Sequence, residues 1–348
     1  MQAGETLTIN HTHKVFRLSS VTQMRNLEFI VWSGDERVVD IDGTVITAVN
    51  SGRVRIGSRF DGRFYNHRDE RVEGRMGMSP IIEIIVVNKQ TMTPIKTADE
   101  LKSISDNTAG HFILKADIDL LGINWIPIGS FSGMLVNPHG FVINNLTINS
   151  AKNLVAGNWG VVRAGLFDRL NGAFIYGVVL EDVFIDVSDA EGPSFAGGIG
   201  VSLWNGSYIV NNRVEGFIAA TYSVGGIAHI CNGDNTLRGN HFRGTLKQQA
   251  RTPDTGYGAG GIMGFMTIRP QNNDGFGGIL PSISRNSHGI FDSHVKAVIM
   301  ASSHAGGIIG FNSNLGLPIN STFEGSLYGG ISQGIMIGNP CPITGDKR

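Results

Sequence analysis

The chain has 348 residues, of which 41% are hydrophobic and 16% charged, so it can bury a core and does not belong to the disordered class. Its 28 basic and 29 acidic residues leave a net charge of -1, which argues against a nucleic-acid partner. The longest apolar run, residues 81–87, contains a glutamate and is far shorter than the roughly 18 residues that span a membrane, so we expect no membrane insertion.

Residues 1–90 are expected to form a small β-rich domain, because short apolar stretches alternate there with turns containing glycine and aspartate. Seven arginines occur between residues 53 and 75, together with four acidic residues. This segment predicts either a solvated, partly self-paired surface or a docking surface for an acidic protein partner, since arginine is favoured at interfaces.

His11 and His13 would point to the same side of an extended segment. Three such pairs around a threefold axis would offer six nitrogens to one metal ion, an arrangement similar to the trimeric tips of some phage fibres. The alternative is an ordinary exposed pair. The metal ion and the homotrimer are therefore hypotheses that rest on two residues.

Thr97 is followed three residues later by Glu100, which is the pattern of a capping box. It predicts a short helix near residues 97–106 with Leu101 and Ile104 on one face. Such a helix would cover the first layer of a following sheet and protect its open edge.

A glycine-centred string returns along the second half of the chain. Its members have their first glycines at unequal intervals of 32, 28, 35, 46 and 23 residues: Gly165, Gly197, Gly225, Gly260, Gly306 and Gly329. We call each copy of this string an anchor. Because the string is retained while the spacing between copies varies, it indicates stacked coils with loops of different length.

Alternating apolar stretches that close on a glycine follow several anchors, at residues 209–218, 237–246 and 319–327. Period-two alternation predicts short strands in each coil. Asn211 and Asn320 lie five residues before the closing glycine, and stacked asparagines would satisfy backbone groups between coils.

These strings resemble the GLUG repeats of bacterial surface adhesins and of some IgA-cleaving metallopeptidases. The resemblance implies an all-β fold, a right-handed parallel β-helix over residues 91–338 with the short capping helix, followed by a tail at 339–348. Gly177 and Gly239 depart from the family's pattern, because they stand where an asparagine is usual.

Two pairs of carboxylates are the candidates for catalysis: Asp117 with Asp119, and Glu181 with Asp182. Paired carboxylates in a groove are what a polysaccharide-cleaving enzyme needs. The first pair belongs to a strand and the second to a turn of the repeat, so we expect structural roles, and no catalytic residue is assigned.

Loop positions are the more promising binding candidates. Seven residues beyond each anchor come Gly172, Trp204, Asn232, Thr267 and Ser313, which we expect to lie near one corner of successive coils. Aromatic, amide and arginine side chains suit recognition. The predicted receptor-binding residues at this corner are Trp204, Tyr208, Arg269, Asn272, Asn273 and Phe276. The alternative is a loop without a binding function, in which Trp204 folds back on the stacked coils.

The sequence therefore predicts a non-enzymatic receptor-binding or adhesion component that recognises a cell-surface glycan or protein. The repeats, with no export signal, fit a phage or phage-like tail in the virion, which would bind tail or baseplate proteins through residues 1–90. The alternatives are a passenger fragment of a bacterial surface adhesin and a polysaccharide-degrading tailspike.

Overall fold

The computed structural model describes most of the chain: residues 4–8, 23–24, 27–34, 36–42, 45–60, 63–65, 71–73, 82–157, 160–232, 235–249, 257–267, 289–312 and 317–340. Two compact units divide the chain, with the boundary between Met92 and Thr93. No helix within the described ranges is long and apolar enough to cross a membrane. His11 and His13 lie outside these ranges.

The first unit is β-rich, as expected, and consists of small antiparallel sheets. Their strands, in spatial order, are β1 (Thr6–Thr8), β5 (Val45–Ala48) and β4 (Val39–Asp42); β3 (Leu27–Gly34), β6 (Gly52–Phe60) and β9 (Ile82–Val86); and β2 (Gln23–Met24), β7 (Arg63–Tyr65) and β8 (Arg71–Glu73), with a short helix η1 (Glu36–Val38). Val54 and Ile56 of β6 are buried, while the intervening Arg55 is half-buried. Part of the arginine-rich segment therefore forms a β-strand, although its many charged residues had predicted only a surface.

The predicted helix follows the first strand of the second unit and is observed as α1 (Ala98–Lys102) and η2 (Ser103–Asp106). Thr97 Oγ1 accepts a hydrogen bond from Glu100 N at 3.2 Å, and the Glu100 carboxylate accepts one from Lys96 N at 2.6 Å. Leu101 and Ile104 are completely buried in the core of the unit. The capping box and the covering role of the helix are confirmed.

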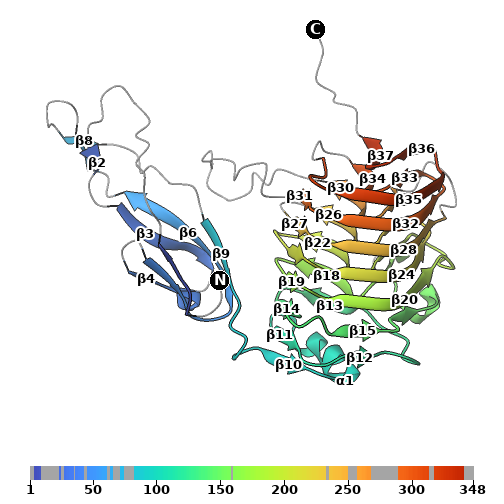
Figure 1. Ribbon diagram of the computed structural model, residues 1–348, viewed down its shortest axis with the longest axis horizontal. Helices are drawn as coiled ribbons and strands as arrows, with labels where there is room; N and C mark the ends of the chain where they lie inside the picture. Colours follow the sequence, from blue (N-terminus) through green and yellow to red (C-terminus); the bar gives the residue numbers. More distant parts are fainter. Residues whose placement is uncertain are drawn as a thin grey trace, which may run out of the picture. The chain divides into compact units, whose positions relative to one another are not determined.

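Four parallel sheets make up the rest of the second unit (Figure 1). Sheet 1 contains β10 (Thr93–Ile95), β11 (His111–Leu114), β14 (Met134–Val136), β19 (Phe174–Tyr176), β23 (Tyr208–Val210), β27 (Thr236–Arg238) and β31 (Gly289–Phe291). Sheet 2 contains β12 (Ile118–Asp119), β15 (Val142–Asn144), β20 (Val179–Val187), β24 (Arg213–Ala220), β28 (His241–Gln248), β32 (His294–Ala301) and β35 (Thr322–Gly329), with β16 (Thr147–Ile148) beside β20.

The other two sheets are joined by the glycine anchors. Sheet 3 contains β13 (Ile128–Phe131), β18 (Phe167–Asn171), β22 (Gly200–Trp204), β26 (Ala228–Asn232), β30 (Met263–Thr267), β34 (Ile309–Asn312) and β37 (Ile337–Pro340). Sheet 4 contains β17 (Val162–Ala164), β21 (Ser194–Gly197), β25 (Ser223–Gly225), β29 (Gly258–Gly260), β33 (His304–Gly306) and β36 (Ser332–Gly334). A short helix, η3 (Ala151–Asn153), precedes β17.

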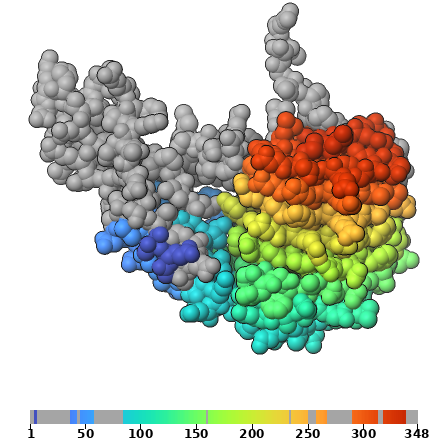
Figure 2. All heavy atoms as spheres, viewed as in Figure 1, coloured from blue at the N-terminus to red at the C-terminus, as the bar shows by residue number. Residues whose placement is uncertain are grey.

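The second unit is a right-handed parallel β-helix, as predicted. From β17 to β34 the chain passes through sheets 4, 3, 1 and 2 in turn before it starts the next coil. Colours that follow the sequence therefore appear as successive layers in Figure 2. One continuous apolar core runs through the coils, and in it the rings of Phe131 and Phe167 stack at a centroid distance of 5.0 Å.

The register of sheet 4 corrects the last predicted anchor. Gly306 pairs with Gly334, whereas Gly329 pairs with Ala301 at the end of sheet 2. The interval from one coil to the next is 28 residues at this point, as the pair His304 and Ser332 shows. The string at Gly329 repeats the letters of an anchor but occupies a different corner.

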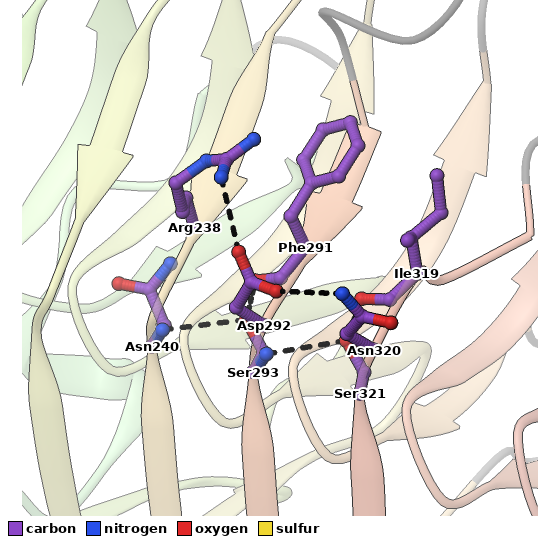
Figure 3. Close-up of polar contacts among 8 residues, drawn as sticks. All are labelled: Arg238, Asn240, Phe291, Asp292, Ser293, Ile319, Asn320 and Ser321. Carbon is purple, nitrogen blue, oxygen red and sulfur yellow. Dashed lines mark hydrogen bonds and ion pairs between the residues drawn. The ribbon is translucent and has the colours of Figure 1, made fainter.

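The corner between sheets 1 and 2 explains why glycine and asparagine interchange (Figure 3). Its first position has a positive φ, from 49° to 69°, in five successive coils, and glycine, asparagine and aspartate tolerate such a φ best. The residues that occupy this position are Gly177, Asn211, Gly239, Asp292 and Asn320. The supposed departures at Gly177 and Gly239 are therefore ordinary variants of one turn.

The hydrogen-bonded ladder at this corner lies one residue later than predicted. Asn212 N donates to Asn240 Oδ1 at 3.1 Å, and Asn240 N donates to Ser293 Oγ at 3.3 Å. Ser293 N continues the ladder to Ser321 Oγ at 3.2 Å (Figure 3). Asn211 and Asn320 shape the turn, while their successors satisfy the buried backbone N–H groups.

The second glycine of the anchor is required by the stacking of coils. A Cβ atom at Gly198, Gly226, Gly261 or Gly307 would lie closest to the carbonyl oxygen of the same position in the next coil, nearer than real Cβ contacts come. The column ends at Ile335, the partner of Gly307, whose side chain is 69% exposed in the last described coil. A side chain is tolerated there because no described coil lies above it.

Replacing Gly261 by alanine should lower the free energy of unfolding by about 1–3 kcal/mol, because the added methyl group meets the Gly307 carbonyl and the Val295 side chain. The change is measured as a shift of the urea midpoint. Gly129→Ala is the control, since a Cβ atom there has no heavy atom within 4 Å. Equal urea midpoints for the two variants would show that the backbones of neighbouring coils can move apart without loss of stability.

Candidate functional site

The four carboxylates considered for catalysis have structural surroundings. Asp117 accepts a hydrogen bond from Val142 N at 2.8 Å. Asp119 accepts hydrogen bonds from Asn145 Nδ2 and Leu121 N, which lower the pKa of its carboxyl group. Glu181 forms an ion pair with Arg213 across two strands of sheet 2, and Asp182 occupies a bulge with φ 51°.

The predicted Trp204 corner is partly described. Trp204 ends β22 and Tyr208 begins β23, so the two flank a turn between sheets 3 and 1, and both are half-buried. The Arg169 guanidinium lies 5.8 Å from the centre of the Trp204 ring. Four further residues of the predicted set lie outside the described ranges: Arg269, Asn272, Asn273 and Phe276.

The register at this corner is close to the predicted one. Asn232 pairs with Thr267, as expected, but Trp204 pairs with Asn171 rather than Gly172. The first anchor has one residue fewer between its glycine and sheet 3, because Phe167 takes the place of Gly200. Ser313 is outside the described residues.

A second surface, which sequence reasoning missed, lies where the outer faces of sheets 3 and 4 meet. The two faces pack closely: Arg163 and Asp168 lie 3.7 Å apart across the seam, and a Cβ atom at Gly264 would collide with Ser223 Oγ. Aromatic and histidine rings from four successive coils gather along this seam. We call them the aromatic strip: Phe195, Tyr222, His229, Tyr257, Phe265, His304 and Phe311.

The rings of the aromatic strip form one unbroken chain of contacts. Between neighbouring coils, the centroid distances are 5.3 Å from Phe195 to Tyr222 and 5.1 Å from Tyr222 to Tyr257. Within one coil, Tyr257 and Phe265 stack at 4.2 Å, and Phe265 then contacts Phe311 of the next coil at 5.4 Å. Tyr257 is 36% exposed and the others, except His229, are half-buried.

His229 is the buried member of the strip. Its ring lies 4.2 Å from that of Phe195, and neither ring nitrogen has a hydrogen-bond partner among the described residues. Burial, and then the positive charge of Arg163, lower the pKa of His229 from 6.5 to about 3. The imidazole is therefore neutral at pH 7, with one donor and one acceptor nitrogen.

The rest of the strip is also without charge at neutral pH. Burial lowers the pKa of His304, whose Nδ1 lies 2.9 Å from Ser332 Oγ, and raises the pKa of the Tyr222 phenol. No group of three metal-ligating side chains is present in the part of the chain that the structure describes. The surface therefore offers rings, hydroxyls and neutral imidazoles.

A short and nearly constant distance in sequence from the first glycine of each anchor is the signal that would have revealed the strip. Phe195 and His304 come two residues before an anchor, and Tyr222 and Tyr257 come three before. Phe265 and Phe311 come five residues after. Each anchor therefore turns the chain so that rings on its two sides meet on the outside.

No family model and no curated protein matches this chain. Among solved structures it is similar to an IgA1 protease, with 11% sequence identity, 92% of this chain covered and a TM-score of 0.42. The chain spans 28% of the length of that protein. The fold is assigned from its own sheets, because so distant a similarity supports no argument about function.

Acidification should destabilise the β-helix through His229. The unfolded chain takes up a proton near pH 6.5, whereas the folded chain resists protonation until about pH 3. The stability present above pH 6.5 is therefore lost as the pH falls through this window, at about 1.4 kcal/mol per pH unit.

Urea unfolding of the wild type and of His229→Phe between pH 7.5 and 4 measures this effect. The variant should lose less stability on acidification. Gly129→Ala, which removes no titratable group, provides the reference slope. Identical slopes for all three proteins would mean that protonation of His229 is not linked to unfolding.

Proposed function

We propose that this chain is a non-enzymatic recognition module that binds a cell-surface glycan or protein through the aromatic strip. The observation that carries the proposal is the unbroken chain of ring contacts over four coils, with ring surface left partly open to solvent. Aromatic side chains contribute most to the energy of many recognition sites.

The scaffold suits this role because the described strip residues lie on or beside strands rather than in long loops. Phe195, Phe265 and Phe311 belong to strands that are hydrogen-bonded to neighbours on both sides. Rings held in this way lose little freedom on binding, so more of the contact energy appears as affinity.

The resemblance to GLUG repeats supports a place on a cell-binding structure, and we propose a phage or phage-like tail component. The first unit would then attach the chain to tail or baseplate proteins, with its arginine-rich strand as one contact. A passenger fragment of a bacterial adhesin is the alternative, since the same recognition surface would serve there.

A polysaccharide-degrading tailspike is the second candidate function. The described carboxylates give it little support, since Asp117 and Asp119 accept backbone hydrogen bonds and Glu181 is paired with Arg213. Shortening of a host polysaccharide by the purified protein would favour this candidate, provided that replacement of one of these carboxylates abolished it.

The double variant Tyr257→Ala with Phe265→Ala should weaken attachment to the target cell, by roughly tenfold or more. Tyr257 is the most exposed member of the strip, and Phe265 stacks on it at 4.2 Å. Attachment is measured with labelled protein over a range of concentrations.

Phe184→Ala is the matched control, because Phe184 is 43% exposed and stacks on Phe217 on sheet 2, away from the seam. It should attach as the wild type does. The Trp204→Ala variant tests the corner predicted from sequence. A loss confined to Trp204→Ala would move the binding surface to that corner and overturn the role of the strip.

A further inference from the structure

We infer that the ligand of the aromatic strip is an uncharged glycan chain that lies along the axis of the β-helix. This inference rests on the proposed function and specifies its ligand. Four properties of the strip lead to this inference: its lack of charge, its small extent, the spacing of its rings, and the His229 ring nitrogens that have no hydrogen-bond partner among the described residues.

The strip is uncharged at neutral pH, because its members are phenylalanine, tyrosine and histidine with lowered pKa values. In the coil that precedes the strip, the charged side chains of Arg163 and Asp168 lie 3.7 Å apart and pair with each other. An acidic polysaccharide needs arginine or lysine to pair with its carboxylates or phosphates. The strip offers hydrophobic ring surface and hydroxyls, which suit an uncharged sugar.

The extent of the strip is too small for a typical protein partner. Seven residues form it, whereas a stable protein interface uses about 20–30 residues on each side. A narrow line of rings instead matches a slender ligand that contacts one ring after another.

The spacing of the rings follows the coils. The centroid distances between rings of successive coils are 5.3, 5.1 and 5.4 Å, close to the rise of about 4.8 Å between paired strands. This repeat is similar to the length of one pyranose ring in an extended glycan. Successive sugars of a linear chain can therefore meet successive coils, some against a ring face and some against a ring edge, because neighbouring rings lie at 80° and 86° to one another.

His229 is the polar side chain of the strip that lacks hydrogen bonds. Its two ring nitrogens lack hydrogen-bond partners within the described ranges although the side chain is 97% buried. A buried polar group without partners is destabilising, and a neutral imidazole needs one donor and one acceptor. A sugar hydroxyl can pair with either nitrogen, as donor to one or as acceptor from the other. The His229 ring lies 4.2 Å from the ring of Phe195, so a hydroxyl reaches it only if Phe195 moves when the sugar binds.

The experiment uses the full chain and linear hexasaccharides of glucose, mannose and galactose, with an oligogalacturonate of the same length as the acidic probe. Isothermal titration calorimetry measures binding. At least one uncharged hexasaccharide should bind, and Tyr257→Ala should weaken that binding about tenfold. Phe184→Ala should bind like the wild type.

The His229→Phe variant separates a binding role from a structural one. It should be at least as stable as the wild type, because it removes an unsatisfied buried group, yet it should bind the sugar more weakly. A variant that is stable and binds the sugar with unchanged affinity would remove His229 from the site and overturn that part of the inference.

The experiments distinguish failure of the uncharged-glycan inference from failure of the proposed recognition function. If the strip variants fail to attach to cells, but no uncharged sugar competes and protease treatment of the cells abolishes attachment, the glycan is overturned while strip-mediated recognition stands. Binding of the oligogalacturonate alone also overturns the uncharged glycan. If the strip variants attach to cells normally, the proposed function fails as well.

Discussion

The close approach of successive backbones at the anchor glycines is the constraint on which the rest of the β-helix depends. At Gly226 and Gly261 a Cβ atom would occupy the space of the next coil's carbonyl oxygen and of a core side chain, Phe242 or Val295. Only hydrogen at this position lets the parallel ladders of sheets 3 and 4 continue across the corner. The coil can therefore turn sharply there, and the core remains closed.

The same turn creates the recognition surface. Because the chain reverses its direction at the anchor, residues shortly before and shortly after the glycines meet on the outside of the molecule. Phe265 and Tyr257 come from opposite sides of one anchor and stack at 4.2 Å. The glycines that the core requires on the inside of the corner therefore also bring aromatic rings together on its outside.

The first coil and the last described coil differ in what covers them. At the first coil, Leu101 and Ile104 of the capping segment are buried, so a short helix covers the apolar interior. In the last described coil, Ile335 stands in the glycine column, and its side chain is 69% exposed. A side chain is accommodated there because no described coil stacks on it.

Much of the architecture was determined by sequence patterns of short range. The capping box at Thr97 and Glu100, the period-two strands and the recurring glycines each act within a few residues, so they could be read directly. What only the tertiary structure decided was register. The string at Gly329 looks like an anchor, yet the ladder aligns Gly334 with Gly306, because hydrogen bonding in parallel strands is set by all the coils together. The aromatic strip depends on the same register: Phe195, Tyr222 and Tyr257 are about 30 residues apart in sequence, and only stacking of the coils brings their rings within about 5 Å.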